Sequence, residues 1–191
     1  MRIVRHEERV EIPENVKVEI DGKKVTVEGP LGKITKDFSH ARVSIRKEGN
    51  EIVVTTFFAR KKEYAVVKTI ASHIKNMIIG VTRGYRYKMK VVYAHFPMNI
   101  TVDENKKLVI IENFLGRKET RYAKIVGDVK VTVQKDDVIV EGIDIDCVAQ
   151  TCANIHLATH LTGDEKLCPH GREGGPGVLD GIYLYAKEHI K

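Results

Sequence analysis

Cationic side chains alternate with aromatic and apolar ones between Tyr85 and Tyr93. Arg86, Lys88 and Lys90 occupy every second position, and the positions around them hold Tyr85, Tyr87, Met89, Val91 and Tyr93. Successive side chains of a β-strand point to opposite faces, and neighbours on one face lie roughly 7 Å apart. Three cations in such a row can meet several phosphates of a polyanion. The pattern therefore predicts a strand with an aromatic face and a cationic face; a merely solvated charged face is the alternative.

The charges around this strand favour contact with nucleic acid. No acidic residue occurs between Glu63 and Asp103, whereas six basic residues fall inside this gap: Lys68, Lys75, Arg83, Arg86, Lys88 and Lys90. The whole chain carries a formal net charge of only +6 with 26 acidic residues, so the excess is concentrated here. A concentrated basic patch raises the local concentration of polyanions.

A zinc site can be drawn from five residues near the C-terminus. His156 and His160 are four residues apart on a predicted helix, Cys152 lies one turn earlier, and Cys168 and His170 follow in a loop. The spacing lacks a Cys-x-x-Cys pair, and Leu157 stands where a zinc protease would place its glutamate base. The chain also lacks a Gly-x-x-x-x-Gly-Lys loop. We therefore predict neither an enzyme nor a bound cofactor.

The strand and helix patterns indicate an α+β protein. Alternating residues predict a hairpin over 16–27, a second pair of strands over 42–46 and 52–56, and an edge strand or arm over the first ten residues. Apolar residues at helical spacing predict helices over 62–79, with Gly80 following its C-terminus, and over about 146–161. A further strand is expected after the second helix.

The chain contains an internal duplication. Residues 12–33 align with residues 96–117 without a gap, so that Pro13 aligns with Pro97 and Gly32 with Gly116. Each copy is expected to pack one mostly antiparallel sheet on one helix, with a core of its own. We place the first copy at 1–80 and the second at 81–191.

The composition indicates the compartment in which the protein works. No apolar run reaches the roughly 18 to 20 residues of a membrane span, and the first residues have no apolar signal-peptide core. Three cysteines fit a reducing compartment better than a disulfide framework. These features predict a cytoplasmic protein.

Several short motifs, in order along the duplicated halves, resemble a ribosomal protein family. They are the run at 80–89, Val-Tyr-Ala-His-Phe-Pro at 92–97, Asn-Phe-Leu-Gly at 113–116 and Leu-Asp-Gly-Ile-Tyr at 179–183. Together they closely resemble the large-subunit family numbered six in bacteria and nine in eukaryotes, in its eukaryotic branch. The resemblance implies a non-enzymatic protein that binds large-subunit ribosomal RNA near the factor-binding centre, contacts neighbouring ribosomal proteins, and makes most RNA contacts through its second domain.

The resemblance assigns RNA contact to three regions. The strand that begins at Arg83 and joins the first copy to the second, here called the handover strand, supplies Arg83, Arg86, Lys88 and Lys90. The hairpin turn of the second copy supplies Gly116, Arg117, Lys118 and Arg121, with an ordinary exposed turn as the alternative. The C-terminal segment supplies Arg172, Gly177, Gly181 and Tyr183, where Tyr183 is equally consistent with a core or edge-strand aromatic.

The C-terminal segment departs from the family pattern. The resemblance predicts a short stretch rich in lysine and arginine after the second helix, but residues 164–177 are less basic and rich in glycine. In this segment the glycines and Tyr183 are therefore better candidates for RNA contact than the charged residues are. The alternative to a ribosomal role is a small zinc-stabilised binding module outside the ribosome.

Overall fold

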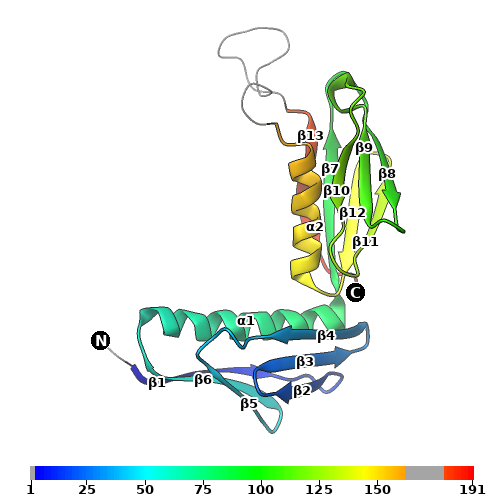
Figure 1. The fold of residues 1–191 in the computed structure, drawn as a ribbon. Coiled ribbons are helices and arrows are strands. Elements are labelled where there is room, and N and C mark those ends of the chain that lie inside the picture. The colour runs from blue at the N-terminus through cyan, green and yellow to red at the C-terminus, as the bar shows by residue number, and fades with distance from the viewer. Residues whose placement is uncertain (1–2, 162–178) are drawn as a thin grey trace. The chain divides into compact units, whose positions relative to one another are not determined.

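The computed structural model describes residues 3–161 and 179–191 (Figure 1). These form two compact units. The first unit contains residues up to Gly84 together with 143–145 and Lys191; the second contains Tyr85–Gly142 and Asp146–Ile190.

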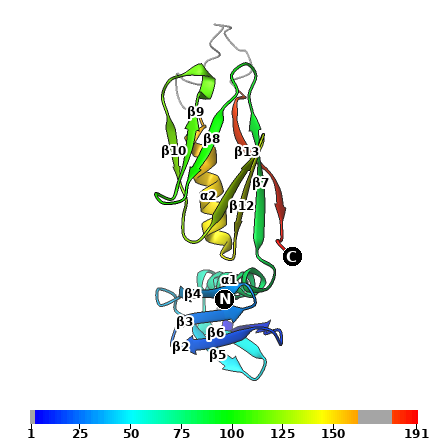
Figure 2. The ribbon, with the colours of Figure 1, turned by 90° about the vertical axis from the view of Figure 1, so that its right-hand side faces the viewer.

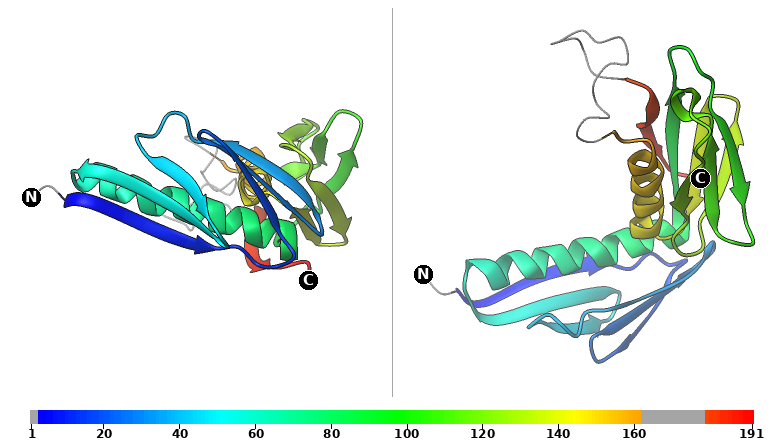
Figure 3. Two further views of the ribbon diagram at one scale, coloured as in Figure 1. Left: turned by 90° about the horizontal axis from the view of Figure 1, so that it is seen from below. Right: turned by 45° about the horizontal axis from the view of Figure 1, so that its top comes forward.

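Two three-stranded antiparallel sheets and one long helix build the first unit. One sheet has the order β1-β6-β5 and the other has the order β2-β3-β4. The elements are β1 (Ile3–Glu11), β2 (Lys17–Asp21), β3 (Lys24–Gly29), β4 (Gly32–Asp37), β5 (Ser44–Glu48), β6 (Glu51–Ala59) and α1 (Lys61–Arg83). Helix α1 lies along the face of these strands (Figure 3).

The core of the first unit lies between α1 and the strands. Val67, Ile74 and Met77 of the helix are buried, and they belong to one cluster with Val25 and Val54 of the strands. The alternating strand residues and the helical apolar stripe therefore meet, as their spacing predicts.

The second unit has a four-stranded and a three-stranded antiparallel sheet with a shorter helix (Figure 2). The sheet orders are β11-β12-β7-β13 and β10-β9-β8. The elements are β7 (Tyr85–Val92), β8 (Asn99–Asp103), β9 (Leu108–Glu112), the 3-10 turn η1 (Phe114–Gly116), β10 (Arg121–Lys124), β11 (Lys130–Gln134), β12 (Asp137–Gly142), α2 (Ile145–Ala158) and β13 (Gly181–Glu188).

The α+β class and the duplication are confirmed, and the strands of each copy divide between two sheets. Strand β4 continues the first hairpin into a third strand, which alternation over 16–27 did not predict.

The gap-free alignment of the two copies is wrong in detail. The first hairpin pairs Asp21 with Lys24, whereas the second pairs Asp103 with Leu108, so its turn is longer. Gly32 lies in strand β4 with φ 148°, but Gly116 lies in a 3-10 turn with φ 71°. Strand pairing defines the correspondence between the copies better than sequence offset does.

Helix α1 ends at Arg83, beyond the predicted end at 79. Val81 is fully buried and continues the apolar stripe of Val67, Ile74 and Ile78, so packing extends the helix through Gly80. The helix stops at Gly84, whose φ of 67° is accessible to glycine. Arg83 therefore belongs to α1 and does not lie on the handover strand.

Candidate nucleic-acid interface

The three cations of β7 share one face, and each has an acidic partner on a neighbouring strand. Arg86 pairs with Glu141 of β12, Lys88 Nζ lies 2.8 Å from Glu188 of β13, and Lys90 Nζ lies 3.4 Å from Asp137 of β12. The hydrogen bond from Lys88 to Glu188 raises the pKa of Lys88.

The predicted cationic row is therefore a ladder of ion pairs. Sequence alternation placed the cations on one face of β7, but it could not show which strands would flank β7 in the sheet.

The opposite face of β7 is core. Tyr85, Tyr87, Met89 and Val91 are all buried, and burial raises the pKa of Tyr87. Tyr93 follows the end of the strand and is 41% exposed. Tyr87 therefore packs in the core and is not available to stack on bases.

A tight turn after β9 presents cations to solvent. Asn113 and Leu115 adopt φ 60° and φ 56°, and Gly116 continues the bend at φ 71°. A Cβ on Gly116 would come within 3.1 Å of the Phe96 ring. Glycine therefore allows both the backbone conformation and the close approach of Phe96. Arg117 and Lys118 follow as exposed residues.

Arg121 differs from these two cations because it is held within the protein. Its Nη1 donates to the Ala158 carbonyl at 3.0 Å, and its guanidinium lies 4.8 Å from the centroid of the buried Phe114 ring. A cation at a helix C-terminus satisfies a carbonyl that has no partner within the helix. Arg121 thus links β10 to the C-terminal end of α2. Its side chain is only partly exposed.

The C-terminal candidates fall into two groups. Arg172 and Gly177 lie outside the described residues. Gly181 begins β13, with φ 159°, and a Cβ there would approach the Tyr183 ring to 3.2 Å. Tyr183 is 38% exposed, and its ring centroid lies 5.3 Å from that of His156. Tyr183 therefore packs along one side and leaves the other in contact with solvent.

The helix residues that the sequence offers as zinc ligands, Cys152 and His156, interact within the protein instead. Cys152 is 4% exposed, and burial raises the pKa of its thiol to about 12, which opposes the thiolate that zinc requires. His156 Nδ1 lies 2.9 Å from the Ile182 carbonyl oxygen. Within 3–161 and 179–191, no three His, Cys, Asp or Glu side chains are grouped to hold a metal ion. Cys168 and His170 lie outside these ranges.

Sequence analysis missed an exposed aromatic and basic cluster in the first unit. Phe57 and Phe58 at the end of β6 are 59% and 69% exposed, and the exposed residues Arg60, Lys61 and Lys62 follow them. Phe58 adopts φ 52°, an uncommon conformation for a residue with a Cβ. The signal was present as two adjacent phenylalanines before a basic run, a composition suited to stacking and phosphate contact.

Among the described residues, no helix is both long enough and apolar enough to cross a membrane.

Comparison with known proteins identifies the family. The family model described as Ribosomal protein L6 matches residues 12–84 and again 96–164, one match in each copy. The chain is 51% identical to the large ribosomal subunit protein uL6 of Desulfurococcus amylolyticus, covering 97% of both chains.

Other archaeal relatives show comparable similarity. The uL6 protein of Staphylothermus marinus is 53% identical, with 93% of this chain and 92% of the relative covered, and that of Pyrobaculum aerophilum is 48% identical over the full length of both. The duplicated fold, the two family matches and these full-length relatives agree: the chain belongs to the ribosomal protein L6 family.

Proposed function

We propose that this protein is a structural constituent of the large ribosomal subunit and that it binds large-subunit ribosomal RNA. The observation that carries the proposal is the full-length similarity to relatives named large ribosomal subunit protein uL6. Its role is to neutralise and position RNA, without catalysis or a cofactor. Its place is on cytoplasmic ribosomes near the factor-binding centre, beside other ribosomal proteins.

The turn at Gly116–Lys118 is the best-supported RNA contact in the second unit. Arg117 and Lys118 are exposed beside a backbone that Gly116 allows to bend sharply. Lys118 forms no ion pair with any residue in the described part of the chain. Lys118 can therefore contact a phosphate without first releasing a carboxylate. Arg83, exposed at the end of α1, offers a further cation.

The ladder on β7 is a secondary contact. Arg86, Lys88 and Lys90 must exchange their carboxylate partners for phosphates before they can bind RNA. Pairs at the surface contribute about 0 to 1 kcal/mol each, so a phosphate can compete with them. The same exchange frees Glu141, Glu188 and Asp137, whose charges then repel RNA. Gly181 and Tyr183, with Arg172 and Gly177, complete the proposed contacts at the C-terminal segment.

Co-sedimentation with large ribosomal subunits through increasing salt tests this function. Replacing Arg117 and Lys118 together with glutamine should weaken association and lower the slope of log affinity against log salt by about two units. Neutralising Arg86, Lys88 and Lys90 should lower it by less than one unit per residue, because each leaves an acidic partner behind. The matched control is Lys130→Gln, which neutralises an exposed lysine on β11.

Failure of the unaltered protein to sediment with large subunits at moderate salt would contradict the proposed function. An unchanged salt slope in the Arg117 and Lys118 variant would instead refute only the assignment of the turn.

A further inference from the structure

The outer edge of β1 is the main structural difference between the two copies. In the second unit β7 lies inside its sheet, between β12 and β13. In the first unit β1 lies at the end of the order β1-β6-β5, and no strand in the described part of the chain pairs with its outer edge. An open edge presents backbone N–H and C=O groups that can accept another strand.

Matching hydrogen bonds show which residues of β1 and β7 correspond. Ile12 N–H donates to the Asn50 carbonyl at 2.9 Å, and Val91 N–H donates to the Asp136 carbonyl at 2.8 Å. Asn50 and Asp136 occupy the same place in the hairpin turns β5-β6 and β11-β12. The strand registers then align Arg9 with Lys88, and Glu11 with Lys90. The edge of β1 from Glu7 to Ile12 thus corresponds to the edge of β7 that β13 covers.

The helices correspond in the same way. The buried residues Val148, Thr151, Cys152 and Ile155 of α2 repeat the spacing of Val67, Ile70, Ala71 and Ile74 in α1. Continuing this spacing aligns His156 with Lys75, and Thr159 with Ile78.

In the second unit these two positions hold strand β13. His156 Nδ1 lies 2.9 Å from the Ile182 carbonyl oxygen, and the Ile182 N–H donates to Thr159 Oγ1 at 3.0 Å. Ile182 itself is fully buried.

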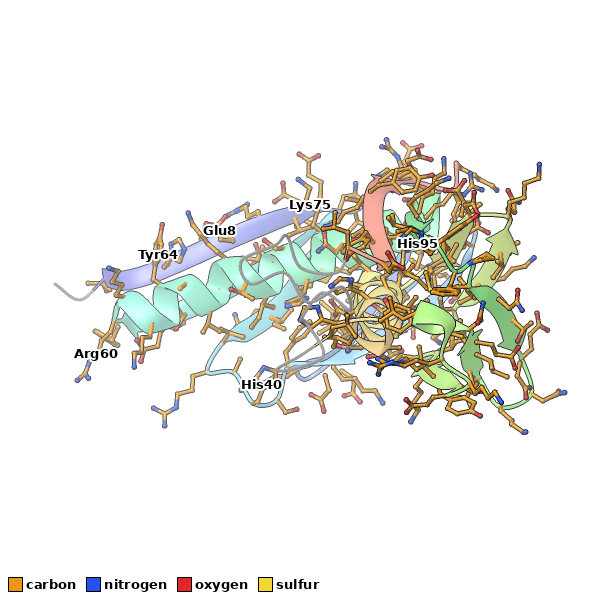
Figure 4. The ribbon with its side chains drawn as sticks, turned by 90° about the horizontal axis from the view of Figure 1, so that it is seen from above. Glu8, His40, Arg60, Tyr64, Lys75 and His95 are labelled. Carbon is orange, nitrogen blue, oxygen red and sulfur yellow. The ribbon has the colours of Figure 1, made fainter. Side chains whose placement is uncertain are left out.

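In the first unit the corresponding positions line an open groove. Its walls are Lys75, Ile78 and Ile79 of α1 and the stretch from Arg9 to Glu14, with Asn50 and Glu51 at one end. Figure 4 shows Lys75 of α1 and Glu8 of β1 on the same side of the first unit. The groove therefore lies where β13 lies in the second unit.

The backbone along this edge is oriented for pairing. Because Ile12 N–H points toward the β5-β6 turn, alternation directs the N–H and C=O groups of Glu7, Arg9 and Glu11 to the outer edge. Lys75 stands where His156 meets a strand carbonyl, and its ammonium can donate to such a carbonyl. Ile12 and Ile78 supply apolar contact for one inward side chain of an added strand.

Charge decides which strand fits. Glu7 and Glu11 replace Arg86 and Lys90 of the second unit, so the edge has the opposite sign at both positions. Arg9 is held by Glu7 and Glu51, each at 3.2 Å. Glu11 forms no ion pair with the residues that the structure describes. Glu7 is also paired with Arg5, so the unpaired carboxylate on this edge, among the described residues, is that of Glu11. It disfavours a phosphate and favours a basic residue opposite it.

The glutamates of this edge also disfavour β13 of a second copy. In the register of the second unit Glu188 faces Arg86, so on β1 it would face Glu7. Like charges placed directly opposite each other destabilise a strand pair.

We propose that the outer edge of β1 binds an extended basic segment of a neighbouring protein as an added antiparallel strand, with an aliphatic side chain opposite Ile12. The inference rests on the proposed function only in taking that neighbour to be a large-subunit protein.

Two synthetic peptides test the proposal. Both span residues 179–190; one carries Tyr183→Lys and Glu188→Lys, so that lysines face Glu11 and Glu7, and the other carries Tyr183→Glu and keeps Glu188. The basic peptide should slow amide hydrogen exchange of Glu7, Arg9 and Glu11 in the full chain by about tenfold or more at saturation. The acidic peptide should leave it unchanged. Absence of protection by the basic peptide, or equal protection by both, would overturn the proposal.

A pair of variants separates edge pairing from other binding. Glu11→Pro removes an N–H that faces the outer edge and leaves the bonds to β6 intact, a place where proline is tolerated. It should abolish protection by the basic peptide, whereas Glu11→Gln should weaken it by a smaller factor. Retained protection in Glu11→Pro would overturn strand addition. Native exchange rates at Val53 and Val54 check that the variant is folded.

The same exchange measurement excludes other occupants. Protection of β1 in concentrated protein alone would mean that a second copy pairs with it, and protection by large-subunit RNA alone would mean that RNA covers it; either result overturns the proposal. Protection of β1 in assembled large subunits, lost in Glu11→Pro, supports it. Because the peptide experiment needs no ribosome, its outcome stays separate from that of the proposed function.

Discussion

The two copies share one backbone plan and differ in what surrounds the first strand of each. In the second copy β7 is flanked on both sides, its cations are paired across the sheet, and β13 is fastened to α2 through Ile182. In the first copy no described strand pairs with the outer edge of β1, which carries the unpaired Glu11 and runs beside a groove. Within the described residues, the duplicated fold therefore keeps the first strand of each copy but covers its outer edge in only one of them.

The largest expected effect comes from disrupting β13. Ile182→Asp would place a carboxylate at a fully buried position. An uncompensated buried charge should destabilise the second unit by on the order of 4 kcal/mol. Denaturant-dependent hydrogen exchange should show faster exchange at Met89 and Val140, with the first unit unchanged.

Val54 in the first unit is the internal control for that experiment, because it is equally buried. If its exchange accelerates along with that of Val140, the two units unfold together, and the proposed division of the chain into separately folding domains would be refuted.

A smaller effect is expected from matched core changes in the two helices. Ile74 and Ile155 occupy corresponding positions and are both fully buried. Isoleucine to valine at either site should cost about 1 kcal/mol, confined to its own unit. Residue-resolved exchange during denaturation measures both. Loss of stability in both units from either single change would mean that the two cores are not separate.

The smallest pH-linked effect at neutral pH concerns Cys152, which aligns with Ala71 of the first copy. Burial raises the pKa of the thiol from 9.0 to about 12, so the folded state keeps its proton where the unfolded state loses it. Its contribution is therefore complete below pH 9 and is lost as the pH rises toward 12. Cys152→Ala should flatten the fall in unfolding free energy over this range. Identical pH profiles for the variant and the unaltered protein would contradict the effect of burial.

Local patterns predicted most of the fold. Alternation and helical spacing located β2, β3, β5, β6, β7 and both helices, because each of these elements buries one face against the core of its own unit. The end of α1 was misplaced because glycine at 80 resembled a terminator, while burial of Val81 favoured continuing the helix. Packing between distant residues overrode the local signal.

The candidate site was less predictable because ion pairing depends on strand order. Nothing in residues 85–93 indicates that Glu141 and Glu188 lie beside Arg86 and Lys88, since these acidic residues are distant in sequence. The position of Arg121 at the end of α2 is likewise a tertiary feature. The edge position of β1 likewise depends on the strand order of its sheet.

A high-resolution map of large ribosomal subunits containing this chain tests most directly whether the two copies bind different partners. We expect ribosomal RNA against the turn at Gly116–Lys118 in the second unit and an antiparallel peptide strand along Glu7–Ile12 in the first. A map with RNA along β1, or with the turn facing solvent and β1 uncovered, would contradict it.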